Sequence, residues 1–310
     1  MKFNSKARLD RSQVQDRRGT RSTGGGFPGP GGSGGGLPGG MPVGGGIGGI
    51  ILMVIIFFVA SQCGGGVPGL GGGSGDTQDA TSDQCLTGAD TDEQDCRVLA
   101  SVNSIQAFWE EALPDQAGVD YETVQYVTFS GGTESQCGQA SSAMGPFYCP
   151  VDRLVYVDLT FFEDMLVGQL GGSGGDFAEA YVMAHEYGHH VQDLLGTLSK
   201  AQSGGAGPTS GSVRVELQAD CFAGVWGNHA TTVENADGEV LIEDLTDEDI
   251  SEAIDAATAV GDDRIQQRSG GQVDEESWTH GSAEQRVRWF QTGYEAGDIS
   301  ACDTFATSSL

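Results

Sequence analysis

Residues 177–195 read Phe177-Ala-Glu-Ala-Tyr-Val-Met-Ala-His-Glu-Tyr-Gly-His-His-Val-Gln-Asp-Leu-Leu195. Apolar residues recur in this stretch at helical spacing and glycines flank it, so the pattern predicts one helix. His185 and His189 are four residues apart and share one face of that helix, where both imidazoles can reach one metal ion. Glu186 is then placed to act as a general base on a water bound to that ion. The alternative is a helix that carries these polar residues on a solvated face.

A catalytic zinc site needs a third protein ligand and an open fourth position. Glu216 and Asp220 are also four residues apart, within an apolar stretch, 213–230, that predicts a second helix. We predict that Glu216 binds the metal and that Asp220 accepts a ring N–H from a ligating histidine, which fixes the tautomer of that ring. Asp193 is a weaker candidate for the third ligand. His190 points away from the face that the histidine pair shares.

Peptide hydrolysis also needs a hydrogen-bond donor, besides zinc, for the oxygen that becomes negative. His280 is our candidate because it lies in a Thr-His-Gly sequence just before a predicted helix, although it could equally be a structural or surface histidine. Arg286 and Arg288 are weaker candidates, since basic residues in an acidic domain also form simple ion pairs. His229 has no special spacing and is predicted to be structural.

The chain is strongly acidic. It has 310 residues, 15 of them Lys or Arg and 44 Asp or Glu, which gives a formal net charge of −29. Such a charge excludes nucleic acid as a partner. Seven of the 15 basic residues fall within residues 1–22 against two acidic ones, so this arm carries +5.

Glycine, proline and serine make up nearly all of residues 19–46, which are predicted to be disordered. Residues 43–62 form an uncharged stretch of the length that spans a bilayer as one helix, and the basic arm places the N-terminus in the cytoplasm. A buried core segment, a cleaved signal peptide and lipid attachment at Cys63 fit less well. Four regions are expected: a basic, Gly-rich and disordered cytoplasmic arm at 1–42, a transmembrane helix at 43–62, a Gly-rich linker at 63–84 and an extracytoplasmic domain at 85–310.

Six cysteines lie within the predicted domain at 85–310, and an even number in an exported domain indicates disulfides. Fifteen pairings are possible for six cysteines. Proximity in the sequence favours the pairs Cys85–Cys96 and Cys137–Cys149, which leaves Cys221 for Cys302. The alternatives are free thiols, above all a buried thiol at Cys221, or a metal cluster, for which no C-x-x-C pair exists.

Strand patterns cluster early in the exported domain and helix patterns late, so the fold class is α+β. We predict a small antiparallel sheet and a helical C-terminal part. The predicted strands and helices are a helix at 97–113 closed by Pro114, a strand at 123–129, a hairpin of 144–149 and 154–159, and helices at 177–195, 213–230, 246–262 and 282–296. The last helix opens with a capping box from Ser282 to Gln285 and ends at Gly297.

The His185-Glu-x-x-His189 and Glu216-x-x-x-Asp220 pair resembles the gluzincin metallopeptidases. The wider set resembles the bacterial membrane-anchored neutral zinc metallopeptidases. The stretches that carry this resemblance, besides the linker and span, are Asp16-Arg-Arg-Gly19, Cys137-Gly-Gln-Ala140, Gly145-Pro-Phe-Tyr-Cys149, His185-Glu-Tyr-Gly-His-His-Val-Gln192, Glu216-Leu-Gln-Ala-Asp-Cys-Phe-Ala-Gly-Val-Trp226, Thr279-His-Gly281, Gln285-Arg-Val-Arg-Trp-Phe290 and Cys302-Asp-Thr-Phe305. The departures are the long acidic linker after the span and the Cys85/Cys96 pair. The resemblance implies a zincin-like domain with Zn²⁺ as its cofactor.

The expected activity is a membrane-anchored zinc endopeptidase that cleaves protein or peptide substrates outside the cytoplasmic membrane. Zinc would lower the pKa of its bound water, Glu186 would take the proton, and His280 would stabilise the oxyanion. The hairpin strands could pair with an extended substrate. The alternatives are a hydrolase of cell-wall peptides and a non-catalytic binding protein that zinc stabilises.

Overall fold

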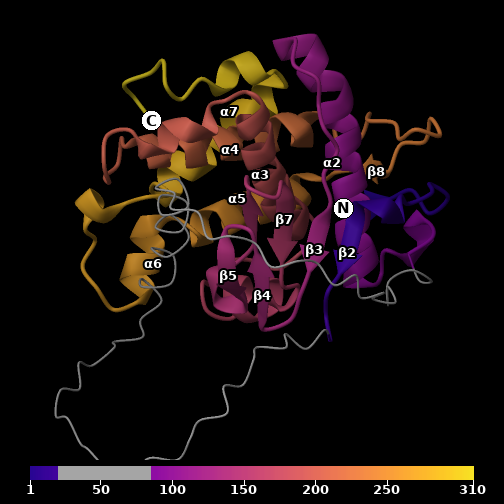
Figure 1. Ribbon diagram of the computed structural model, residues 1–310, viewed down its shortest axis with the longest axis horizontal. Helices are drawn as coiled ribbons and strands as arrows, with labels where there is room; N and C mark the ends of the chain where they lie inside the picture. Colours follow the sequence, from indigo (N-terminus) through magenta and orange to yellow (C-terminus); the bar gives the residue numbers. More distant parts are fainter. Residues whose placement is uncertain (20–84) are drawn as a thin grey trace, which may run out of the picture.

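The computed structural model describes residues 1–19 and 85–310, shown in colour in Figure 1. Most of the predicted disordered linker and the whole predicted span at 43–62 lie outside these residues. Among the residues described, no helix combines the length and the apolar character needed to cross a membrane.

The main sheet has four strands in the order β2-β3-β7-β6. Their bounds are Val14–Asp16 for β2, Tyr126–Thr128 for β3, Phe147–Cys149 for β6 and Leu154–Val157 for β7. The predicted hairpin is confirmed, because β6 and β7 pair antiparallel across a short turn. The prediction of an antiparallel sheet is otherwise wrong: β3 pairs parallel with both β2 and β7. Parallel pairing follows because longer connections, and not tight turns, join these strands.

The remaining described strands form two smaller sheets of two strands each. In one, β4 (Gly132–Ser135) pairs antiparallel with β5 (Gly138–Ser141), a hairpin that the sequence analysis missed. In the other, β1 (Lys2–Phe3) pairs antiparallel with β8 (Ile242–Asp244).

Residues 1–19 are therefore part of the fold, and the structure differs here from the predicted disordered arm. Figure 1 shows β2, in the indigo of the N-terminus, beside β3. Leu9 and Val14 are buried among the core residues. Arg18 donates to the buried carboxylate of Asp16 at 2.9 Å and also pairs with Asp95 of the first long helix at 2.7 Å. The many basic residues of this segment hid the few apolar ones, such as Leu9 and Val14, that pack it against the domain.

Six α-helices are described, and their bounds are Gln94–Ala117 for α2, Asp176–Leu194 for α3, Gly211–His229 for α4, Asp247–Ala259 for α5, Asp262–Arg268 for α6 and Ala283–Ala296 for α7. The capping box at Ser282 and the end at Gly297 are confirmed. The helix α2 passes through Pro114 and ends three residues later, before Gly118 in the left-handed region. The predicted helix at 246–262 corresponds to α5, which ends at Ala259. The chain turns at Gly261, where a Cβ would lie 2.4 Å from the backbone nitrogen of Ala283, and α6, which was not predicted, follows this turn.

Shorter helical turns lie between these elements. They are η1 (Arg11–Gln13), η2 (Gly88–Asp90), η3 (Ser142–Met144), the π-helical η4 (Phe161–Val167), η5 (Leu198–Gln202), η6 (Glu275–Ser277) and η7 (Ile299–Cys302).

All three predicted disulfides are confirmed: Cys85–Cys96, Cys137–Cys149 and Cys221–Cys302. The third joins α4 to η7, and both of its residues are fully buried. It therefore fixes the C-terminal segment to the helix that carries Glu216.

Candidate metal centre

The helix α3 supplies the first three site residues. Its first turn is capped from α5, since the Glu252 carboxylate accepts from the backbone N–H of Phe177 at 3.1 Å. The rings of His185 and His189 lie 4.8 Å apart on one face, as the spacing predicts. Gly188 lets α4 approach that face: a Cβ there would lie 3.1 Å from the carbonyl oxygen of Ala219. The glycine within the histidine motif thus sets the distance between the two helices of the site.

Glu216 of α4 reaches both histidines. Its two oxygens lie 3.2 Å from Nε2 of His185 and 3.6 Å from Nε2 of His189. These three side chains can offer ligand atoms that all lie within 4.8 Å of one another. A tetrahedral ion with metal–ligand distances near 2.0–2.1 Å separates its ligands by about 3.4 Å. The donor types and their spacing therefore fit a zinc ion.

Asp220 lies behind the site and is fully buried. One of its oxygens is 2.8 Å from Nδ1 of His185 and accepts the Tyr181 hydroxyl at 2.6 Å. A carboxylate only accepts, so Nδ1 of His185 carries the proton and Nε2 keeps its lone pair free for a metal. The structure places Asp220 where the sequence analysis predicted.

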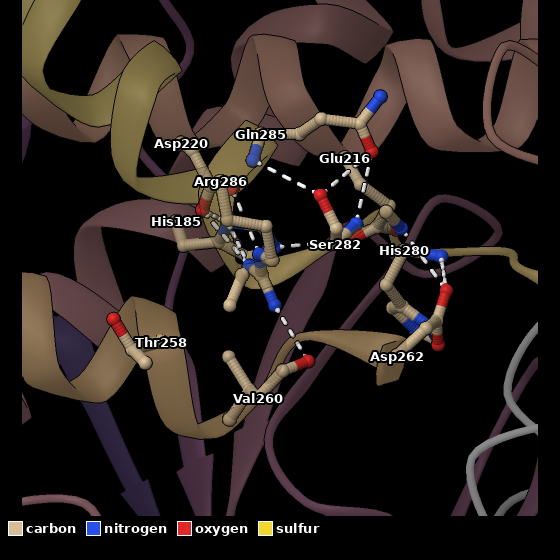
Figure 2. A network of polar contacts seen from close by, with 12 residues as sticks. His185, Glu216, Asp220, Thr258, Val260, Asp262, His280, Ser282, Gln285 and Arg286 are labelled. Carbon is tan, nitrogen blue, oxygen red and sulfur yellow. Dashed lines mark hydrogen bonds and ion pairs between the residues drawn. The ribbon is translucent and has the colours of Figure 1, made fainter. Parts of the chain in front are cut away.

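Arg286 completes this buried network, as Figure 2 shows. Its Nε and Nη2 each donate to an Asp220 oxygen at 2.8 Å, and Nη1 donates to the Val260 carbonyl at 3.4 Å. These hydrogen bonds engage the guanidinium on the side of His185 where Asp220 lies. Arg286 therefore holds Asp220 in place. Arg288, two residues on, is half exposed, donates to the Leu310 carbonyl and lies 3.8 Å from Glu284.

Two glycines bring Arg286 to Asp220. A Cβ on Gly224 of α4 would lie 2.1 Å from the Phe290 carbonyl oxygen, and one on Gly293 of α7 would lie 1.9 Å from that of Cys221. The two helices therefore cross with their backbones in contact, which only glycine permits.

The electrostatics of the site favour a cation. Burial raises the pKa of Glu216, but the neighbouring His189, His280 and His185 lower it by more. Its pKa therefore lies well below the usual range. Burial lowers the pKa of His185, whereas Asp220 and Glu216 raise it to about 9. The centre therefore holds a positive charge readily, and a metal ion can take the place of that proton.

His280 borders the same cavity, on the side away from Asp220. Its turn is held by Asp262, whose Oδ2 accepts from three consecutive backbone N–H groups, those of residues 279–281, at 2.7–3.0 Å. The other Asp262 oxygen lies 3.4 Å from Nδ1 of His280. Burial lowers the pKa of His280, but Glu216 and Asp262 raise it more, so its pKa lies above the usual value. Asp262 has no signal of its own in the sequence, because only the fold brings it to the Thr-His-Gly turn.

Glu186 also borders this cavity and is largely buried. Within the described residues, no hydrogen bond or ion pair engages its carboxylate. It is thus available to accept a proton from a water at the metal position.

The remaining candidates lie outside the centre. His190 is fully buried, donates from Nε2 to the Glu122 carbonyl at 2.7 Å and lies 3.0 Å from the Tyr148 hydroxyl. Asp193 accepts from that hydroxyl at 3.0 Å and does not join the metal-binding group. His229 stacks on Phe108 and lies 2.8 Å from the Gly297 carbonyl. These contacts make all three residues structural.

The structure brings two histidines of α3 and a glutamate of α4 together as a group that could hold a metal ion, with Glu186 beside the first histidine. The chain belongs to the family described as "Putative neutral zinc metallopeptidase", whose profile matches residues 1–305. It is 52% identical over 229 residues to the uncharacterized protein Rv2575 of Mycobacterium tuberculosis, covering 73% of this chain and 76% of the relative. It is 39% identical over 308 residues to the uncharacterized protein YpfJ of Escherichia coli, covering 97% and 98%. No solved structure matches the chain significantly.

Proposed function

We propose that the protein is a zinc-dependent endopeptidase. The observation that supports this most directly is the group of His185, His189 and Glu216, whose donor atoms have the separation of zinc ligands, with Glu186 beside them. Three protein ligands leave a fourth position open, as catalytic zinc sites require. A purely structural zinc would be closed by a fourth residue and would leave Glu186 without a role.

Zinc, when bound here, lowers the pKa of a water molecule and polarises the carbonyl to be attacked. Glu186 would take a proton from a water as the water oxygen bonds to the peptide carbonyl carbon, and would pass that proton to the amine nitrogen as the C–N bond breaks. Nδ1 of His280 faces Thr279 and Asp262, so in the protonated ring, which the raised pKa favours, Nε2–H would be the group that donates to the carbonyl oxygen as negative charge develops. The turn fixed by Asp262 keeps His280 in position before the substrate arrives.

The walls of the cavity support an apolar substrate side chain next to the cleaved bond. Its lining includes Met144, Phe147, Phe161, Met165, Leu198 and Ile265. Among its described lining residues, the charged ones all belong to the metal centre, so no free charge is left to pair with a charged substrate. The edge strand β6 contributes Phe147 and Tyr148 to the wall, and an extended peptide could pair with this strand.

The three disulfides support a location outside the cytoplasm, where such bonds persist. We extend the proposal to a cell-envelope location, with 43–62 as a membrane anchor that leaves residues 1–19 on the same side of the membrane as residues 85–310. Proteins or peptides of that compartment would be the substrates.

The test is a peptidase assay on casein and, in parallel, on purified peptidoglycan, for wild type and Glu186→Gln, with and without a chelator. We expect cleavage of casein that chelation abolishes and zinc restores, and that Glu186→Gln lacks. Cleavage of peptidoglycan alone would point to a cell-wall peptide hydrolase. Zinc binding without any hydrolysis would point to a binding protein.

A second variant tests the cavity wall. Met165 is partly buried at the cavity and contacts none of the site residues through hydrogen bonds. Met165→Lys should shift cleavage toward acidic residues beside the scissile bond, whereas Met165→Leu should keep the wild-type preference. An unchanged preference in Met165→Lys would show that the substrate side chain lies elsewhere.

A further inference from the structure

Gln192 lies on α3 one turn after His189 and is fully buried. Its Oε1 is 2.8 Å from Nδ1 of His189. In the sequence, Gln192 is only the last residue of the stretch 185–192 that carries the family resemblance. In the fold, it occupies for His189 the position that Asp220 occupies for His185.

The orientation of the Gln192 amide follows from its other contacts. Its Nε2 donates to the Val215 carbonyl at 2.7 Å and to Oε1 of Gln218 at 3.1 Å. Both partners are acceptors, so the amide nitrogen must face them and the amide oxygen must face His189. Nδ1 of His189 therefore carries the proton, and Nε2, on the side of Glu216, has its lone pair free.

Gln218 continues the chain of contacts to the C-terminal segment. Its Nε2 donates to the carbonyl of Cys302 at 2.9 Å, and its Oε1 also accepts from the Thr197 hydroxyl at 3.1 Å. Cys302 is bonded to Cys221 on α4, three residues after Gln218. The inward-facing donors and acceptors of both amides are thus matched. This matching favours one orientation of each amide group.

We propose that Gln192 is a positioning residue that sets zinc affinity by orienting His189, and that Gln218 and the Cys221–Cys302 bond hold it in place. This inference rests on the proposed zinc site. The two histidines are then oriented by different means: His185 by a carboxylate whose charge Arg286 balances, and His189 by a neutral amide. The C-terminal segment, far from the site in sequence, becomes part of the metal-binding structure.

The experiment measures the zinc dissociation constant by competition with a chromogenic chelator, for the full chain with its disulfides intact. Gln192→Leu keeps the side-chain size but removes the acceptor, so zinc should bind about 10–100-fold more weakly. Gln218→Leu should give a smaller loss in the same direction, as should the Cys221→Ala/Cys302→Ala double variant. Gln291→Leu, an exposed position on α7, is the matched control and should bind zinc as wild type does.

Cobalt substitution gives a second readout, because the visible bands of Co²⁺ report ligand geometry. We expect them to shift in Gln192→Leu and to stay unchanged in Gln291→Leu. Zinc affinity of Gln192→Leu within twofold of wild type, with unshifted bands, would overturn the proposal. If Gln192→Leu does not fold, Gln218→Leu decides by the same criteria. Failure of wild type to bind zinc would refute the proposed function, a different outcome.

Discussion

Replacing Arg286 by methionine should destabilise the domain far more than any surface substitution. Arg286 and Asp220 are 4% and 0% exposed, and the guanidinium donates twice to the carboxylate at 2.8 Å. Without it, Asp220 keeps only its contacts with Tyr181 and His185. Two buried carboxylates, Asp220 and Glu216, would then share the single positive charge of His185, so the charge of Asp220 would be only partly balanced.

Removing one partner of a buried ion pair costs about 3–5 kcal/mol in the free energy of unfolding. Arg288→Met is the matched control, since it removes the same group two residues away on α7 from a half-exposed side chain. There the loss should stay under about 1 kcal/mol. The assay is urea unfolding of the metal-free protein, so that weaker metal binding does not add to the measured difference.

A double-mutant cycle separates the ion pair from loss of packing. Because Asp220→Asn removes the charge that Arg286 balances, the double variant should lose less stability than the two single losses added together, by about 1–3 kcal/mol. A loss below 1 kcal/mol in Arg286→Met, or strict additivity in the cycle, would refute the view that Arg286 is there to balance Asp220.

Three other predictions follow from the geometry. Glu216→Ala should lose bound zinc together with activity, whereas Glu186→Gln should keep zinc, measured by metal analysis, and lose activity; equal zinc content in wild type and a His185→Ala/His189→Ala variant would contradict the site. Deleting residues 1–19 removes β1, β2 and the buried Leu9 and Val14, so urea unfolding should show at least about 3 kcal/mol less stability; a wild-type unfolding curve would show that the segment is dispensable. Burial raises the pKa of Asp262, but its bonds to His280 and to three backbone N–H groups lower it further, so the folded pKa lies below the unfolded one. The stability it contributes is therefore present above about pH 4 and is lost as the pH falls through the folded pKa, and Asp262→Asn should flatten this acid dependence in unfolding titrations.

The site could be predicted from the sequence where its residues lie on one helix. A spacing of four along α3 or α4 fixes a shared face, so the positions of His185, His189, Glu216 and Asp220 followed from local geometry. The disulfides followed from short sequence separations and from elimination. The capping box at Ser282 and the helix end at Gly297 left equally local signals.

Partners joined only by the fold could not be predicted in this way. Asp262 and Arg286 reach the centre through the turn at Gly261 and the crossing of α4 and α7. Gln192 lies one turn from His189, but a glutamine in an apolar helix has many uses, and its role depends on Gln218 of another helix. The strand β2 lies in a charged segment where Val14 gives little apolar pattern, and its pairing with β3 spans more than a hundred residues.

The N-terminal strands bear on how the chain can sit in a membrane. Backbone hydrogen bonds join β1 to β8 and β2 to β3, and paired strands must lie in one compartment. One crossing at 43–62 would place residues 1–19 and 85–310 on opposite sides of the membrane. A molecule with a single crossing therefore could not have this strand pairing. We infer that residues 1–19 accompany the disulfide-bonded domain. A cysteine introduced at exposed Ser5 should then react, in intact spheroplasts, with a reagent that does not cross the membrane. The opposite result would be labelling of Ser5→Cys only after lysis, while a surface cysteine of the domain is labelled before lysis. That result would establish the single crossing. It would also show that the N-terminal strands pair only in molecules that are not inserted in the membrane.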